Sequence, residues 1–122
     1  MTSIQPQLWV DHPREALAFY KLAFGARVLL LVGEGDDIVA QLAVGDAAFW
    51  ISLADERIGR VSPGATSTGR ILLVVDDPHS VVAAATDAGA TALAEVHDEH
   101  GWLLGRIRDP SGHEWEIGTP TA

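Results

Sequence analysis

Residues 108–118 read RDPSGHEWEIG, and the rest of the chain is organised around this stretch. Pro110 and Gly112 predict a tight turn, because proline sets φ at one turn position and glycine permits conformations that other residues avoid. After the turn, Trp115 and Ile117 alternate with two glutamates, which is the period of a strand with one apolar and one polar face. Two interpretations are open: a solvated edge strand, or a strand that presents a carboxylate to a ligand or a metal ion.

The length and composition predict one globular domain. A chain of 122 residues, with 48% hydrophobic and 20% charged residues, has the size of an ordinary domain. Such a chain buries about two-thirds of its unfolded surface. No apolar run reaches the roughly 18 residues of a membrane-spanning helix, and the N-terminus lacks the basic and then apolar pattern of a secretion signal. The expected compartment is therefore the cytoplasm.

Charge and cysteine content argue against several functions. The chain has no cysteine, and hence no disulfide, thiol nucleophile or thiolate metal site. A formal net charge of −9 argues against nucleic-acid binding and favours a neutral or cationic ligand over a polyanion. The glycine-containing segments lack the lysine of a phosphate-binding loop and the dinucleotide fingerprint, so no organic cofactor is expected.

The first half of the chain predicts a strand, a helix and three further strands, at residues 4–10, 13–24, 26–33, 38–44 and 47–53. Pro6 restricts the first strand to a sheet edge or a bulge. Asp11 is expected to cap the helix, which starts at Pro13 and ends before Gly25. Residues 54–69 contain glycine, proline, serine and threonine without periodicity, and we expect a linker or a mobile loop there.

The same order of elements then recurs, at residues 70–76, 79–88, 91–97, 102–109 and 113–118. The run VDHP at 10–13 matches VDDP at 75–78, 65 residues later, and GA at 25–26 matches GA at 89–90, 64 residues later. Such internal self-similarity predicts two copies of one structural unit. We therefore expect a single α+β domain of two tandem βαβββ modules, at about 1–53 and 70–122.

These features resemble the vicinal oxygen chelate superfamily, which includes glyoxalase I, extradiol dioxygenases, and fosfomycin- and bleomycin-resistance proteins. The resemblance covers essentially the whole chain and rests on AFYKLAFGA at 18–26, VDD at 75–77 and DPSGHEWE at 109–116. It is strongest toward small bacterial glyoxalase/bleomycin-resistance-like proteins, and it implies curved mixed sheets around a cleft. Because this fold hosts many reactions, the motifs specify the fold better than the chemistry.

The resemblance also implies where a cleft would lie. Family enzymes take metal ligands from the first and last strands of both modules, and the matching positions here are Gln5, Trp50, Arg70 and Glu116. A catalytic divalent ion needs about three nitrogen or oxygen donors. Tryptophan ligates nothing, and an arginine that stays protonated repels a cation. We therefore expect no metal, with Arg70 reaching across the cleft to pair with Glu116.

Four tryptophans are many for a chain of this size. Trp115 is predicted to pack in the core, whereas Trp9, Trp50 and Trp102 alternate oppositely to the apolar residues beside them and are expected on the concave side. Aromatic walls suit flat apolar ligands and cations, and tryptophan is also enriched at subunit interfaces. A pocket and a dimer interface therefore remain alternatives, and one residue can serve both.

The five histidines have no metal-site spacing. His97 and His100 flank a predicted hairpin turn with two acidic residues, where solvation is a simpler explanation than a metal patch. His113 follows the turn glycine and is expected to hydrogen-bond within that turn.

The sequence thus predicts a homodimer that binds a small aromatic or cationic molecule without a metal. The residues expected to form its cleft are Gln5, Trp9, Trp50, Arg70, Trp102 and Glu116. The alternative is a metal-dependent lyase, isomerase or dioxygenase in which Gln5 is a metal ligand and Glu116 a ligand or base. A third possibility is an interaction module without a pocket, in which Trp50 and Trp102 are buried between subunits.

Overall fold

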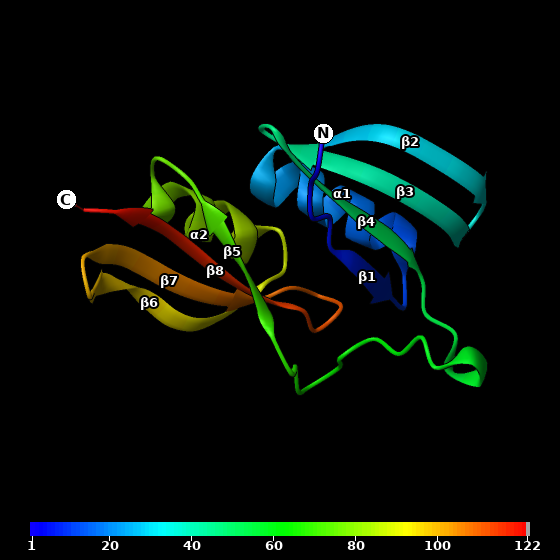
Figure 1. The fold of residues 1–122 in the computed structure, drawn as a ribbon. Coiled ribbons are helices and arrows are strands. Elements are labelled where there is room, and N and C mark those ends of the chain that lie inside the picture. The colour runs from blue at the N-terminus through cyan, green and yellow to red at the C-terminus, as the bar shows by residue number, and fades with distance from the viewer. Residues whose placement is uncertain (122) are drawn as a thin grey trace.

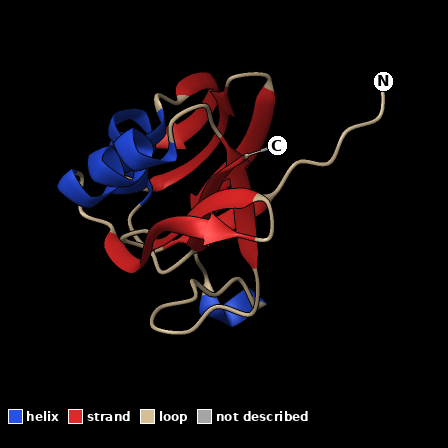
Figure 2. Ribbon diagram, turned by 90° about the vertical axis from the view of Figure 1, so that its left-hand side faces the viewer, coloured by secondary structure: helices blue, strands red, loops and turns tan. Residues whose placement is uncertain are grey.

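The computed structural model describes residues 1–121, and its two α-helices lie on one side of its eight strands (Figure 1 and Figure 2). The first module comprises β1 (Gln7–Val10), α1 (Pro13–Phe24), β2 (Arg27–Glu34), β3 (Asp37–Val44) and β4 (Ala47–Leu53). The second comprises β5 (Arg70–Val74), α2 (Pro78–Asp87), β6 (Thr91–Glu99), β7 (Trp102–Arg108) and β8 (Glu114–Pro120). The predicted repeat of strand, helix and three strands is confirmed.

Each module forms its own four-stranded mixed sheet, in the orders β1-β4-β3-β2 and β5-β8-β7-β6. The outer strands β1 and β5 run parallel to β4 and β8, and the other neighbours are antiparallel. The strand after Pro6 is indeed at a sheet edge. In contrast, β8 has β5 on one side and β7 on the other, so the interpretation of residues 113–118 as a solvated edge strand is wrong.

The helix ends follow local chemistry with one exception. Gly25 adopts the left-handed conformation, with φ of 67°, and ends α1 as predicted. Asp77 caps α2 by accepting a hydrogen bond from the backbone N–H of Ser80. The prediction that Asp11 caps α1 is wrong: the carbonyl of His12 accepts the first helical hydrogen bond, so His12 is the capping position, and its side chain makes no capping bond.

The core lies between the helices and the sheets and joins the two modules. Helices α1 and α2 pack against each other. The indole of Trp115, from β8, is 3% exposed, and its centroid lies 4.8 Å from the ring of Phe24, 5.5 Å from Phe49 and 5.7 Å from Tyr20. Tilted and edge-on ring pairs of this kind add stability beyond the area they bury. The predicted core position of Trp115 is therefore confirmed.

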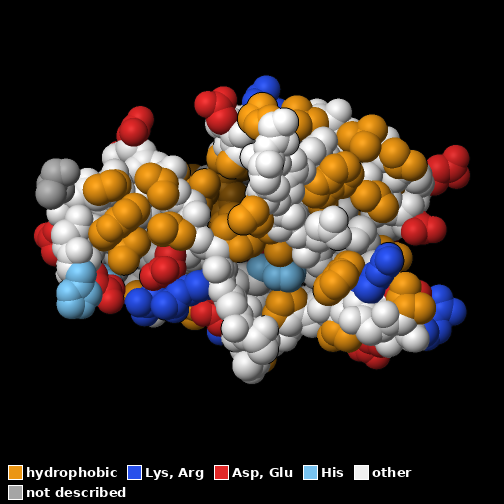
Figure 3. All heavy atoms as spheres, viewed as in Figure 1, with side chains coloured by type: hydrophobic (Ala, Val, Ile, Leu, Met, Phe, Trp, Pro, Cys, Tyr) orange, Lys and Arg blue, Asp and Glu red, His pale blue; other side chains and the backbone are white. Residues whose placement is uncertain are grey.

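Within residues 1–121, no helix covers the other face of either sheet (Figure 2). Figure 3 views these open faces and shows two areas of hydrophobic side chains, one over the second sheet and one over β2 and β3. The exposed apolar residues include Leu30 and Val39 of the first sheet and Leu72 and Val74 of the second. No helix among the described residues is long and apolar enough to cross a membrane.

Candidate functional site

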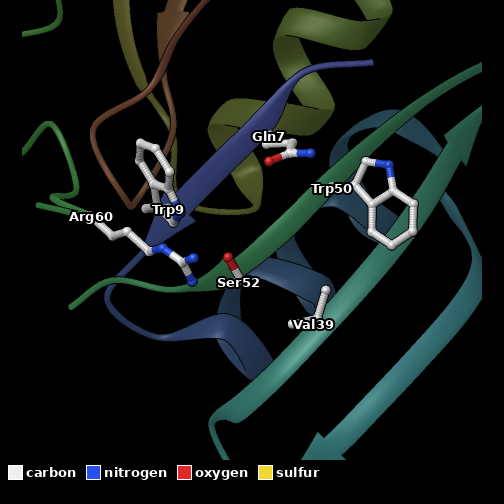
Figure 4. Close-up of a pocket in the computed structure, with 6 residues that line it drawn as sticks. All are labelled: Gln7, Trp9, Val39, Trp50, Ser52 and Arg60. Atoms are coloured by element: carbon white, nitrogen blue, oxygen red, sulfur yellow. The ribbon is translucent and has the colours of Figure 1, made fainter. Parts of the chain in front are cut away.

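A cavity of about 310 Å³ opens on the uncovered face of the first sheet (Figure 4). Its lining residues are Gln7, Trp9, Val39, Trp50, Ser52 and Arg60. In the parallel pair of β1 and β4, Gln7 lies opposite Trp50 and Trp9 lies opposite Ser52. Because alternate side chains of a strand point to one face, these four side chains are neighbours on the open face. The alternation of Trp9 and Trp50 against the core is therefore confirmed.

Gln5 precedes β1 and holds one wall of this cavity in place. Its side-chain oxygen accepts hydrogen bonds from the indole N–H of Trp50, at 2.8 Å, and from the amide of Gln41, at 3.0 Å. An amide oxygen has two lone pairs, and both are used here. Gln5 therefore orients the indole of Trp50, and in this arrangement its oxygen has no lone pair left for a metal ion.

Glu116 lies on the open face of the second sheet, between two arginines. The Nε of Arg70 is 3.3 Å from one carboxylate oxygen, and the Nε of Arg106 is 3.3 Å from the other. The predicted pair of Arg70 and Glu116 is present. Arg106 was missed, although a signal existed: Arg106 and Glu116 are equally distant from Ser111, so a hairpin centred there places them side by side, as the β7–β8 register does.

The charged cluster continues across the second sheet. Glu99 lies 3.7 Å from Arg106 and 3.1 Å from the Nε2 of His97, and Arg108 pairs with Glu114 at 3.5 Å. The pKa of His97 is raised, first by the backbone carbonyl of Glu95, which its Nδ1 contacts at 2.8 Å, and further by the carboxylate of Glu99. Each glutamate of this cluster therefore has a cationic or hydrogen-bonding partner already.

The residues at the positions implied by the resemblance do not fit a catalytic divalent ion. The oxygen of Gln5 accepts two hydrogen bonds, Trp50 has no ligating atom, and Arg70 occupies the carboxylate of Glu116. Nor do three His, Asp or Glu side chains converge anywhere in the part of the chain that the structure describes.

The six predicted cleft residues form two groups and one outlier. Trp9 and Trp50 lie in the first sheet, with Gln5 just before its strand β1, and Arg70 and Glu116 lie in the second. Trp102 lies at the far end of β7, opposite Glu99 and Pro120, four positions from Arg106.

Four residues that line the cavity were missed: Gln7, Val39, Ser52 and Arg60. Gln7 shares the alternation of Trp9, and Ser52 that of Trp50, so both could have been found from strand period alone. Arg60 lies in the segment without periodicity, and no sequence pattern points to it.

The ring of His113 connects the two modules. Its Nε2 donates a hydrogen bond to the backbone carbonyl of Trp9, at 2.9 Å, while its backbone N–H binds the carboxylate of Asp109, at 3.0 Å. The expectation of bonding within the turn therefore holds for the backbone of His113 but not for its ring. This contact ties the strand that carries Trp9 to the turn before β8.

Sequence comparison places the chain in a family. The family model of the glyoxalase-like domain matches residues 7–118. An uncharacterised protein of Mycobacterium bovis is 32% identical over 126 residues, which cover 97% of this chain and 83% of that protein.

Solved structures share the architecture. A gene product of Arabidopsis thaliana is 28% identical with a TM-score of 0.78, over 96% of this chain and 98% of the other. The fosfomycin-resistance protein FosX of Listeria monocytogenes is 14% identical with a TM-score of 0.77, over 99% of this chain and 94% of its own, which is a likeness of fold alone. The chain therefore belongs to the glyoxalase-like family, within the glyoxalase, bleomycin-resistance and fosfomycin-resistance fold of the vicinal oxygen chelate proteins.

Proposed function

We propose that the protein is a cytoplasmic binding protein that holds a small aromatic molecule without a metal ion. The observation that carries this proposal is the contrast between the two sheets. The first has an open cavity walled by Trp9 and Trp50, whereas the carboxylate at the expected metal position, Glu116, is paired with Arg70 and Arg106.

The cavity has the chemistry of a binding site for a flat ring. Small-molecule pockets are mostly apolar with a few polar groups that set orientation, and their volumes start at roughly 300 Å³. Trp9, Trp50 and Val39 supply the apolar walls, and Gln7 and Ser52 supply the polar groups. A volume of about 310 Å³ suits a ligand of one ring or two fused rings.

Calorimetric titration with 2-naphthamide, a neutral flat probe, in the presence of EDTA tests this function. The expected result is binding by the native protein and a loss of about tenfold or more in affinity for Trp50→Ala, since stacking on an aromatic ring contributes about 1–3 kcal/mol per base in nucleic-acid complexes. Leu22→Ala, at an exposed position of α1, is the control and should bind as the native protein does. Unchanged affinity in Trp50→Ala would place the site elsewhere.

The alternative is a metal-dependent enzyme that uses Glu116. It requires Arg70 and Arg106 to release the carboxylate. Elemental analysis of protein purified without a chelator and without a histidine tag distinguishes the two. Near-stoichiometric zinc, nickel, iron or manganese that is lost in Glu116→Gln would support the enzyme and overturn the metal-free proposal.

A second copy of the chain is the partner that the exposed surface favours. Strand β2 is a sheet edge, and residues 28–32, VLLLV, are all 36–57% exposed. A long apolar edge strand is a surface that associates unless it is covered. Light scattering after size exclusion should report a dimer, and Leu31→Lys should shift it toward the monomer while Leu22→Lys on α1 should not. A native monomer at all concentrations would contradict this.

A further inference from the structure

Of the described residues that line the cavity, Arg60 alone is charged. In Figure 4 its guanidinium extends toward Ser52, on the side of the cavity where Trp9 lies. From this arrangement we propose that the ligand is an aromatic anion, a flat ring that bears a carboxylate or a similar acid, and that Arg60 selects it. The inference rests on the proposed function and refines its ligand class, because the sequence alone favoured a neutral or cationic ligand.

A hydrogen-bonded turn of the backbone positions Arg60 at the cavity. After β4, Asp55 and Arg60 exchange two backbone hydrogen bonds, of 2.7 and 3.0 Å, around a short 3₁₀ helix, Glu56–Ile58. Gly59 closes the turn with φ of 76°, in the left-handed region that glycine adopts easily. The segment 54–69, for which a linker or a mobile loop was expected, thus contains a defined turn in its first part. Arg60 has a defined backbone position next to the end of β4.

Among the described residues, no side chain forms a direct hydrogen bond or ion pair with the guanidinium of Arg60. The carboxylate of Asp55, the backbone partner of Arg60, forms a bidentate pair with Arg57. The Nε and Nη2 of Arg57 lie 3.0 and 2.9 Å from its two oxygens. The pKa of Asp55 is lowered chiefly by this hydrogen bond from Arg57, and the charge of Arg60 contributes least. The donors of Arg60 are thus available to a ligand.

The donors around the cavity match a carboxylate. A guanidinium presents N–H groups in a planar fork that binds two carboxylate oxygens at once. Gln7 and Ser52 add an amide and a hydroxyl donor at the same opening. A cationic ligand would instead place two like charges together, and no Asp or Glu is among the described residues that line the cavity.

The negative charge of the whole chain does not reverse this preference. The formal net charge is −9, but it is spread over the surface. At physiological ionic strength, charges farther away than about 8 Å are largely screened. A guanidinium in direct contact with the ligand therefore decides the sign of the preferred charge.

Three probes with one ring system test the inference: 2-naphthoate, neutral 2-naphthamide and the cation of 2-naphthylmethylamine. We expect the native protein to bind naphthoate most tightly and the cation most weakly. Arg60→Gln should weaken naphthoate about ten- to hundredfold, the range of a charge-assisted hydrogen bond, and leave naphthamide within about threefold. Arg27→Gln, on β2 and outside the cavity lining, makes the same change in net charge and should leave all three affinities unchanged.

Each other outcome has a defined meaning. Equal binding of naphthoate and naphthamide by the native protein, or tightest binding of the cation, would overturn the anion inference and leave the proposed function in place. Equal losses for naphthoate and naphthamide in Arg60→Gln would show that Arg60 shapes the cavity rather than selecting charge. If none of the three probes binds, the proposed function itself fails.

Discussion

The phenol of Tyr20, on α1, donates a hydrogen bond to the carboxylate of Asp109, which lies 89 residues later in the turn before β8. The other donors to this carboxylate are the indole N–H of Trp115, at 3.0 Å, and the backbone N–H groups of Ser111 and His113, at 2.9 and 3.0 Å. Asp109 is only 4% exposed. A buried charge is tolerated when its hydrogen bonds are satisfied, and here the partners come from both modules.

Removing this carboxylate should destabilise the whole domain. Asp109→Ala leaves the phenol of Tyr20 and the indole N–H of Trp115 without a partner, at about 1–3 kcal/mol for each buried unpaired group. We expect a loss of about 3 kcal/mol or more in the free energy of unfolding, measured by urea denaturation. The exposed Asp98→Ala should change it by less than about 0.5 kcal/mol. A loss of similar size in both variants would show that Asp109 does not link the modules.

Tyr20 should make the stability fall at high pH. Burial raises its pKa well above 10.0, and the charge of Asp109 raises it further. The unfolded chain releases this proton near pH 10, before the folded chain does, so the contribution of Tyr20 is complete below pH 10 and is lost as the pH rises above it. Tyr20 is the only tyrosine, so the tyrosinate absorbance reports it alone. We expect that absorbance to appear together with unfolding, and titration of a folded chain near pH 10 would contradict this.

The pKa of His97 should be sensitive to the charged cluster of the second sheet. Its raised pKa owes most to the backbone carbonyl of Glu95 and less to the carboxylate of Glu99. Glu99→Gln should therefore lower the pKa of His97, which proton NMR of the ring measures. Glu95→Gln keeps the carbonyl in place and should lower it less. The opposite order would mean that the side chain of Glu95, rather than its backbone, holds the imidazolium.

Arg70 should be the residue that keeps metals from Glu116. Arg70→His replaces a cation that pairs with the carboxylate by a neutral nitrogen donor beside it. We expect zinc affinity, measured by calorimetry, to rise at least about tenfold over the native protein, and the gain to vanish in the double variant with Glu116→Gln. Arg27→His is the control. Tight zinc binding by the native protein at Glu116 would refute this role of Arg70.

The sequence was sufficient to predict the helices and strands and the face of each strand on which a side chain lies, since both depend on local patterns. Pro13 and Gly25 bound α1 as predicted, because both act through their own backbone conformation. Strand period placed Trp9 and Trp50 on the open face. The repeated run before each helix predicted the second module from the first. The pairing of Arg70 with Glu116 followed from the resemblance combined with charge.

Only the tertiary structure decided which groups meet across the chain. Three contacts join segments that are far apart in sequence. Strand β8 lies between β5 and β7, Tyr20 bonds to Asp109, and the side-chain oxygen of Gln5 accepts hydrogen bonds from Gln41 and Trp50. Arg60 lies at the cavity because a turn after β4 returns there, and its segment has no periodicity to reveal this. Local patterns set the conformation and the face of each residue, whereas its partners are set by how the elements pack.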